Sequence, residues 1–109
     1  EKVGNFESMF AVYWNLAQNE KNPDSSARIL ADTADLVASH GLTDRAVQAF
    51  QAAVEKTPNN VAMYKRFAAM LEKAGRRQEA HQAISAGLKI NPLDEDLKKR
   101  EADLATAPK

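Results

Sequence analysis

The fold is decided by two consecutive stretches of similar sequence. Residues 27–60 read ARILADTADLVASHGLTDRAVQAFQAAVEKTPNN, and residues 61–92 read VAMYKRFAAMLEKAGRRQEAHQAISAGLKINP. When residues 27–60 are compared with the residues 34 positions later, seven positions are identical. These are Ala34 and Ala68, Gly41 and Gly75, Ala46 and Ala80, Gln48 and Gln82, Ala49 and Ala83, Ala52 and Ala86, and Pro58 and Pro92. A fixed period of this length indicates a repeat protein built from supersecondary units.

Each stretch has the pattern of two helices joined by a tight turn. Apolar residues recur at intervals of three and four, as in Leu30, Ala34 and Val37, which is the period of an amphipathic helix. Gly41 and Gly75 follow the first helix of each stretch, where glycine readily takes the left-handed conformation. A proline follows the second helix and stops it. Small residues alternate with large ones, so we expect antiparallel helices in close contact.

These positions resemble the tetratricopeptide repeat family, with units that start at Ala27 and Val61. The positions that carry the resemblance are Leu30, Tyr64, Ala34, Ala68, Val37, Leu71, Gly41, Gly75, Ala46, Ala80, Phe50, Ile84, Pro58 and Pro92. The first unit departs from the family pattern at Thr33, where an apolar residue is usual, and at Leu30, where an aromatic residue is usual. The resemblance implies an all-α fold: a right-handed solenoid of antiparallel helix pairs with about two full repeats and flanking helices.

We expect a single domain over residues 1–109, with repeats at 27–60 and 61–92 and a helix on either side. The first flanking helix is predicted at residues 6–21, as the last helix of a preceding repeat or a dedicated cap. Its apolar residues spread over more than one face, which is typical of a helix buried on more than one side. They are Phe6, Met9, Phe10, Val12, Tyr13, Trp14, Leu16 and Ala17. Ser25 and Ser26 are predicted to cap the helix that follows.

The second flanking helix is predicted at residues 94–105. Asp94, Glu95 and Asp96 place negative charge at its start, which favours the helix dipole, and three basic residues follow. It has the polar character of the terminal helix that a repeat array needs for solubility.

Composition excludes several classes of function. The chain has 109 residues, no cysteine, and 15 Lys and Arg against 15 Asp and Glu, so its formal charge is zero. Without cysteine there is no disulfide, thiolate zinc site or cysteine nucleophile, and zero net charge argues against a nucleic-acid binder.

The longest apolar run, Met9 to Trp14, is too short to cross a membrane. The chain starts with Glu1, so we expect a processed chain or a piece of a longer protein, and the cytosol and the periplasm both stay open.

We expect neither an enzyme nor a cofactor. His40 and His81 lie in different structural positions with no carboxylate cluster between them. We interpret His40 as part of a helix end and His81 as a surface residue. The serines lack a nucleophile motif and no glycine-rich phosphate loop occurs.

The resemblance implies that the first helix of each pair lines a concave, partner-binding face. The candidate binding residues carried over are Arg28, Asp32, Asp35, Lys65, Arg66, Ala69 and Lys73; the same face would include Ala31, Ala38, Ser39, Ala62 and Glu72. Family members that clamp a C-terminal carboxylate use a Lys and an Asn one turn apart, and no such Asn is present here. Two interpretations stay open: Asp32 and Asp35 neutralise Lys65 and Arg66, or an acidic peptide docks beside Lys65, Arg66 and Lys73.

Two functions remain open. The first is a non-catalytic scaffold that binds a peptide or protein on the first-helix face. The alternative is an assembly module that contacts a second copy or a neighbouring domain through the apolar N-terminal helix, with Phe10, Tyr13 and Trp14 as the interface. Contiguous exposed apolar patches of more than about a few hundred Å² are typical of such interfaces.

Overall fold

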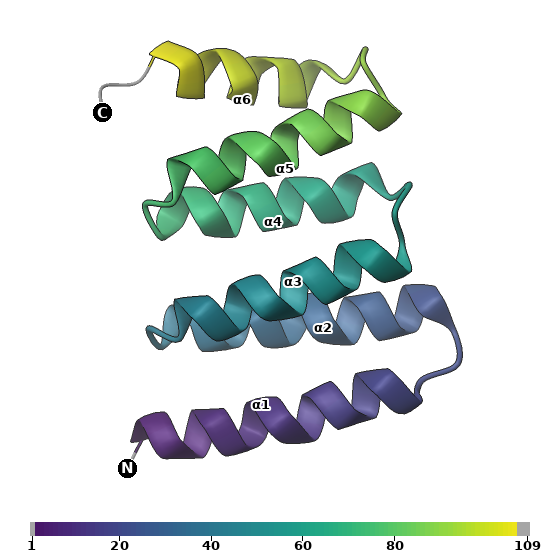
Figure 1. The fold of residues 1–109 in the computed structure, drawn as a ribbon, viewed down its shortest axis with the longest axis vertical. Coiled ribbons are helices and arrows are strands. Elements are labelled where there is room, and N and C mark those ends of the chain that lie inside the picture. Colours follow the sequence, from purple (N-terminus) through teal and green to yellow (C-terminus); the bar gives the residue numbers. More distant parts are fainter. Residues whose placement is uncertain (1, 107–109) are drawn as a thin grey trace. The chain divides into compact units, whose positions relative to one another are not determined.

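The computed structural model describes the backbone of residues 2–106 and the side chains of residues 6–104. These residues form helices only, which confirms the all-α prediction (Figure 1). The helices are α1 (Lys2–Asn19), α2 (Pro23–Ser39), α3 (Thr43–Lys56), α4 (Val61–Lys73), α5 (Arg77–Ile90) and α6 (Glu95–Thr106). The flanking helices were predicted at residues 6–21 and 94–105, so α1 starts and ends earlier than predicted, and α6 is shifted by one residue.

The helices gather into two compact units, Glu1–Pro58 (unit 1) and Asn59–Lys109 (unit 2). Unit 1 contains α1, α2 and α3, and unit 2 contains α4, α5 and α6. A single domain over residues 1–109 stays a prediction.

The turn within each helix pair depends on its glycine, as predicted. Gly41 has a φ of 87°, which lets the N–H of Leu42 donate to the carbonyl oxygen of Val37 at 2.9 Å. Gly75 has a φ of 79° and is followed by the same kind of hydrogen bond, from the N–H of Arg76 to Leu71 at 2.9 Å. Residues with a side chain adopt this backbone conformation only at a cost.

In unit 1, α2 packs against α3 on one side and against α1 on the other. The hydroxyl of Ser26 in α2 donates to the carbonyl oxygen of Ala17 in α1. The prediction that Ser25 and Ser26 cap α2 is wrong. Asn22 is the cap, because its side chain accepts from the N–H of Ser25, and Pro23 takes the first helical position, where its missing N–H costs nothing.

The core of unit 1 follows the predicted repeat register. Its fully buried apolar side chains are Ala17, Ala27, Leu30, Ala31, Ala34, Val37, Ala46, Ala49, Phe50 and Ala53. Thr33 replaces the apolar residue usual at its position and is nevertheless buried. Its hydroxyl donates to the carbonyl oxygen of Ile29 at 2.7 Å, which satisfies the polar group inside the helix.

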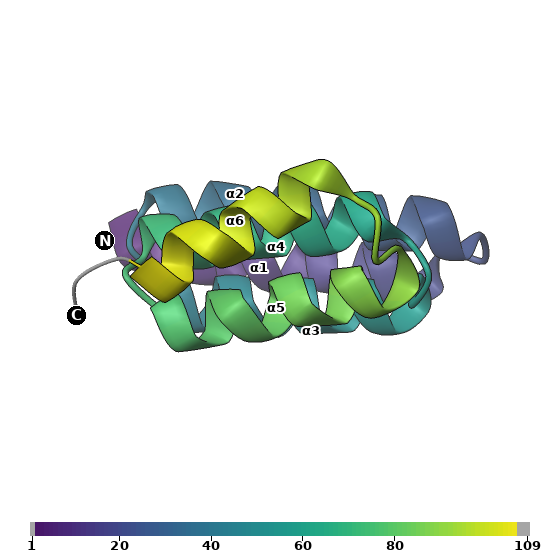
Figure 2. The ribbon, with the colours of Figure 1, turned by 90° about the horizontal axis from the view of Figure 1, so that it is seen from above.

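In unit 2, α5 packs against α4 and against α6, and α6 lies beside α5 in both views (Figure 1 and Figure 2). Gly87 of α5 allows a close approach: a Cβ added there would lie 2.8 Å from a methyl carbon of Leu97 and 3.4 Å from Cβ of Tyr64. Three helices therefore meet at one small residue. Asn60 caps α4, and the carboxylate of Asp94 accepts the N–H of Leu97 at the start of α6.

Candidate functional site

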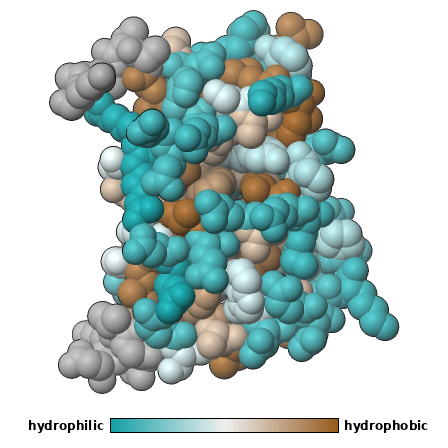
Figure 3. Space-filling view, viewed as in Figure 1, coloured by the Kyte–Doolittle hydropathy of each residue, from teal (hydrophilic) through white to brown (hydrophobic). Residues whose placement is uncertain are grey.

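Most of the exposed large apolar side chains lie on α1 and α2. Among the residues whose side chains are described, the exposed large hydrophobic ones are Val12, Tyr13, Leu16, Leu36 and Leu93. Val12, Tyr13 and Leu16 belong to α1 and Leu36 belongs to α2, whereas Leu93 stands between α5 and α6. Hydrophilic side chains cover much of the face seen in Figure 3, with hydrophobic patches between them. Apolar exposure is therefore concentrated in unit 1.

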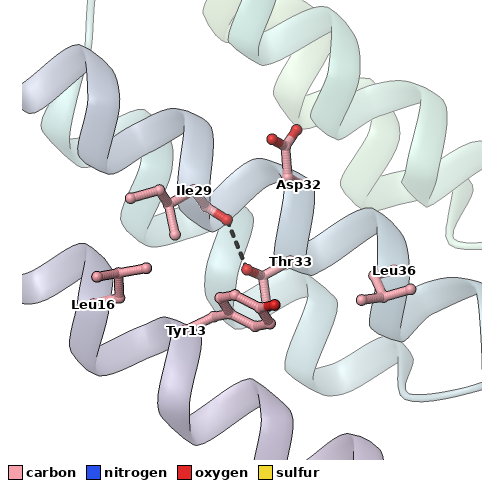
Figure 4. A pocket seen from close by; sticks show the side chains of 6 residues that line it. All are labelled: Tyr13, Leu16, Ile29, Asp32, Thr33 and Leu36. Carbon is pink, nitrogen blue, oxygen red and sulfur yellow. Dashed lines mark hydrogen bonds between the residues drawn. The ribbon is translucent and has the colours of Figure 1, made fainter.

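An open groove of about 270 Å³ separates α1 from α2 (Figure 4). We call it the α1–α2 groove. It is lined by Tyr13, Leu16, Ile29, Asp32, Thr33 and Leu36. Residues three or four apart share one face of a helix. Tyr13 and Leu16 therefore form one wall and the four residues of α2 form the other. The Thr33 hydroxyl is already bonded to Ile29, so the other polar groups of the lining are the Tyr13 hydroxyl and the Asp32 carboxylate at the rim.

The wall formed by α1 is held in place at both ends of the helix. Near its C-terminus, the Ser26 hydroxyl bonds to Ala17 at 2.7 Å. Near its N-terminus, Nε of Arg45 in α3 pairs with the carboxylate of Glu7 at 2.8 Å. The ring of Phe6 stacks on His40 with centroids 3.8 Å apart, so His40 lies at a helix end as predicted and contacts α1. These contacts therefore link α1 to α2 and α3 at both ends of the groove.

The three residues of the predicted interface, Phe10, Tyr13 and Trp14, differ in how exposed they are. Phe10 is only 6% exposed, with its ring centroid 5.6 Å from that of Trp14 and the Arg45 guanidinium carbon 5.8 Å above it. Phe10 therefore does not offer the exposed surface that an interface needs, and the Arg45 side chain of α3 lies over its ring. Trp14 is half-buried, and Tyr13 is exposed and lines the groove.

The predicted residues of the first-helix face belong to two different units. Arg28, Asp32 and Asp35 are exposed on α2, and Asp32 lines the α1–α2 groove. On α4, Lys73 is exposed, whereas Lys65, Arg66 and Ala69 are half-buried. Ala31 was placed on the same face but is fully buried in the core.

Lys65 pairs with the acidic start of α6. Its ammonium lies 3.0 Å from a carboxylate oxygen of Asp94 and 3.7 Å from one of Asp96. The hydrogen bond from the backbone N–H of Leu97 lowers the pKa of Asp94, and its bond with Lys65 lowers it further. A second link joins α6 to α4, since Arg100 lies 3.4 Å from the carboxylate of Glu72. The sequence reasoning considered only Asp32 and Asp35 as partners for Lys65 and missed this acidic run.

Four residues of the groove were missed as site residues: Leu16, Ile29, Thr33 and Leu36. Leu16, Ile29 and Leu36 are ordinary apolar positions in the helical pattern. The sequence feature that pointed to this region was the unusually wide apolar surface of the N-terminal helix. That feature did not show which side of the helix would stay exposed.

A second groove, of about 460 Å³, runs between α1 and α3. It is lined by Trp14, Gln18, Gln48, Gln51, Ala52, Glu55 and Lys56. Its side chains are mostly polar, so it offers little apolar surface to bury on binding.

Antiparallel helix pairs with a 34-residue period, glycine turns and an open groove define a helical-repeat protein. The sequence model of the tetratricopeptide repeat matches residues 37–104, which is more than half of the chain. The chain therefore belongs to the tetratricopeptide repeat family, and the match continues through most of α6. No curated protein matches it.

Membership of this family gives the general class of function. Tetratricopeptide repeats act as scaffolds for protein–protein interaction, bind proteins or peptides, and are generally not enzymes. Within the part of the chain that the structure describes, none of the helices has the length and apolar character needed to cross a membrane.

Proposed function

We propose that this chain is a non-catalytic scaffold that binds a peptide or protein partner through the α1–α2 groove. One observation carries the proposal: apolar side chains from two helices face each other across an open groove, in a family that binds polypeptides. Exposed apolar patches with a polar rim are typical of interaction sites.

The groove offers binding energy to a polypeptide side chain. Leu16 is 53% exposed and Leu36 is 38% exposed. Fully burying an exposed leucine side chain is worth about 1.5–3 kcal/mol, and the exposed parts of these two together amount to roughly one leucine, so covering both contributes about that much to the free energy of binding. The walls are also held by contacts outside the groove, which lowers the entropic cost of association.

This groove includes part of the predicted first-helix face. Asp32 lies at its rim, and Arg28 and Asp35 are on the same helix. The residues of α4, which are Lys65, Arg66, Ala69 and Lys73, belong to the other unit. An acidic peptide docked on α4 would compete with Asp94 and Asp96 for Lys65. We therefore place the main contact on unit 1.

The test is a selection of peptides from a random library on the immobilised full chain. Each selected peptide is then measured against the variants Leu16→Asp and Leu36→Asp. Leu93→Asp is the matched control, because it puts the same charge on an exposed leucine of unit 2. The proposal predicts that the two groove variants lose most of the affinity and the control keeps it. Peptides that bind all three variants like wild type contradict it.

The second candidate is the assembly module, in which a second copy of the chain covers the exposed side of α1. Val12 and Leu16 favour it, because both are more than half exposed on that helix. Sedimentation equilibrium of the wild type and of Leu16→Asp separates the two functions. A concentration-dependent dimer that Leu16→Asp dissociates supports assembly, and a monomer at every concentration excludes self-association of the chain.

A further inference from the structure

In unit 2, one side of the α5–α6 pair is covered by α4. The two helices α4 and α6 are joined at two points, Lys65 with Asp94 and Glu72 with Arg100, at 3.0 Å and 3.4 Å. The order of these contacts along the two helices means that α4 and α6 run in the same direction, as Figure 1 also shows. Leu97 of α6 has no exposed surface. It is buried where α4, α5 and α6 meet at Gly87.

The α1–α2 pair of unit 1 corresponds to the α5–α6 pair of unit 2. In both, a helix is followed by an antiparallel helix that packs against it. Two steps of the 34-residue period relate Ile29 of α2 to Leu97 of α6, and Asp32 of α2 to Arg100 of α6. Leu97 and Arg100 lie on the side of α6 that α4 covers, whereas Ile29 and Asp32 line the α1–α2 groove. In unit 2, α4 covers one side of α6. The α1–α2 groove therefore lies on the equivalent side of α2.

From this correspondence we infer that the α1–α2 groove receives an amphipathic helix of a partner protein, which packs as α4 packs on α5 and α6. The inference rests on the proposed function and adds the shape of the partner. The bound helix runs parallel to α2 and antiparallel to α1. Its apolar face covers Tyr13, Leu16, Ile29 and Leu36, and α4 indicates a length of about three and a half turns, since α4 has 13 residues.

The charges on α2 give the order of charges on the partner helix. In unit 2, Asp96 and Arg100 of α6 pair with Lys65 and Glu72 of α4. The corresponding residues of α2 are Arg28 and Asp32, which have the opposite signs.

The partner helix is therefore expected to carry an acidic residue opposite Arg28 and a basic residue seven positions later, opposite Asp32. This order disfavours α4 of a second copy as the occupant, because Lys65 would then lie against Arg28, and Glu72 against Asp32.

The experiment uses two peptides and the full-length chain. The first peptide has the sequence of residues 61–73, and the second carries Lys65→Glu and Glu72→Lys. Both contain a side-chain lactam on the face away from the groove, because isolated helices of this length are marginal in water. Their affinities are measured by fluorescence anisotropy, and circular dichroism checks that both are helical.

The inference predicts that the exchanged peptide binds about tenfold more tightly than the native-sequence peptide, since two exposed charge pairs replace two repulsive contacts. The protein variant Arg28→Asp/Asp32→Arg reverses that preference. Equal affinities for the two peptides, or a preference that the protein variant does not reverse, overturn the inference. Library peptides that depend on Leu16 and Leu36 but bind in an extended conformation also overturn it, while the proposed function stands. If no peptide depends on Leu16 or Leu36, the proposed function fails as well.

Discussion

The hydroxyl of Ser26 in α2 donates a 2.7 Å hydrogen bond to the carbonyl oxygen of Ala17 in α1, and both residues are fully buried. This bond joins the first turn of α2 to the last turn of α1. Ser26→Ala should lower the free energy of unfolding by about 1 kcal/mol, since the carbonyl keeps its other hydrogen bond, from the N–H of Glu20. Denaturant unfolding measures the change. Ser25→Ala is the control, and a change as large in that variant would contradict the assignment.

Arg45 should stabilise the packing of the N-terminal half of α1. It pairs with Glu7 and lies over the ring of Phe10, which in turn contacts Trp14. An exposed ion pair contributes about 0.2–1 kcal/mol to the free energy of unfolding. An exposed cation–π contact contributes about 0.5–1 kcal/mol. We therefore expect Arg45→Ala to cost about 1 kcal/mol and to shift Trp14 emission to the red at lower denaturant concentration. The control is Lys89→Ala, a substitution of an exposed residue in unit 2. It should change neither the free energy of unfolding nor the denaturant dependence of Trp14 emission. If Trp14 emission in Arg45→Ala follows wild type, Arg45 does not hold α1.

Gly87 and Leu97 should be energetically coupled. Gly→Ala within a helix normally stabilises by about 1 kcal/mol. In the wild type, however, the added Cβ would lie 2.8 Å from buried Leu97, and overpacking of this kind costs about 1–3 kcal/mol. We expect Gly87→Ala to destabilise the wild type and to stabilise the Leu97→Ala variant. A double-mutant cycle by thermal unfolding measures the coupling, and additive effects would show that the two residues do not touch.

The ion pair between Lys65 and Asp94 should give the stability of unit 2 a defined pH dependence. The folded state lowers the pKa of Asp94 from its ordinary value of 3.8, chiefly through the N–H of Leu97 and then through Lys65. The stabilisation from the carboxylate is therefore complete well above pH 3.8 and is lost as the pH falls through the lower pKa of the folded state. Asp94→Asn keeps an oxygen that can cap α6 and removes the charge. It should be less stable than wild type at pH 7, and the difference should shrink as the pH falls below 3.8 and through the lower pKa of the folded state. A difference that does not shrink as the pH is lowered in this way would contradict this account.

The helix pairs and their turns were predictable because local chemistry determines them. Gly41 and Gly75 have the positive φ that a helix followed by a sharp turn requires. The apolar period placed Leu30, Ala34 and Phe50 in the core, where all three are fully buried. The repeat period identified the family, and the family match confirms it.

The groove was not predictable in the same way, because it depends on which sides of α1 are covered. Phe10 and Leu16 both belong to the apolar surface of that helix. Arg45 of α3 lies over Phe10, whereas Leu16 stays more than half exposed. The partners of Lys65 depend likewise on the packing of α6, which brings Asp94 beside it. The period of the apolar residues does not show which side of α1 stays exposed or which carboxylates lie beside Lys65.

The central claim is that a polypeptide binds in the α1–α2 groove, and chemical-shift mapping tests it most directly. The ¹⁵N-labelled full chain is titrated with a library-selected peptide, and backbone amide shifts are followed. The account predicts that the largest shifts occur at residues 13–16 and 29–36, the stretches that contain the groove, and that they disappear with Leu16→Asp. Shifts that are largest along α4 and α6, and that Leu16→Asp leaves unchanged, would contradict it.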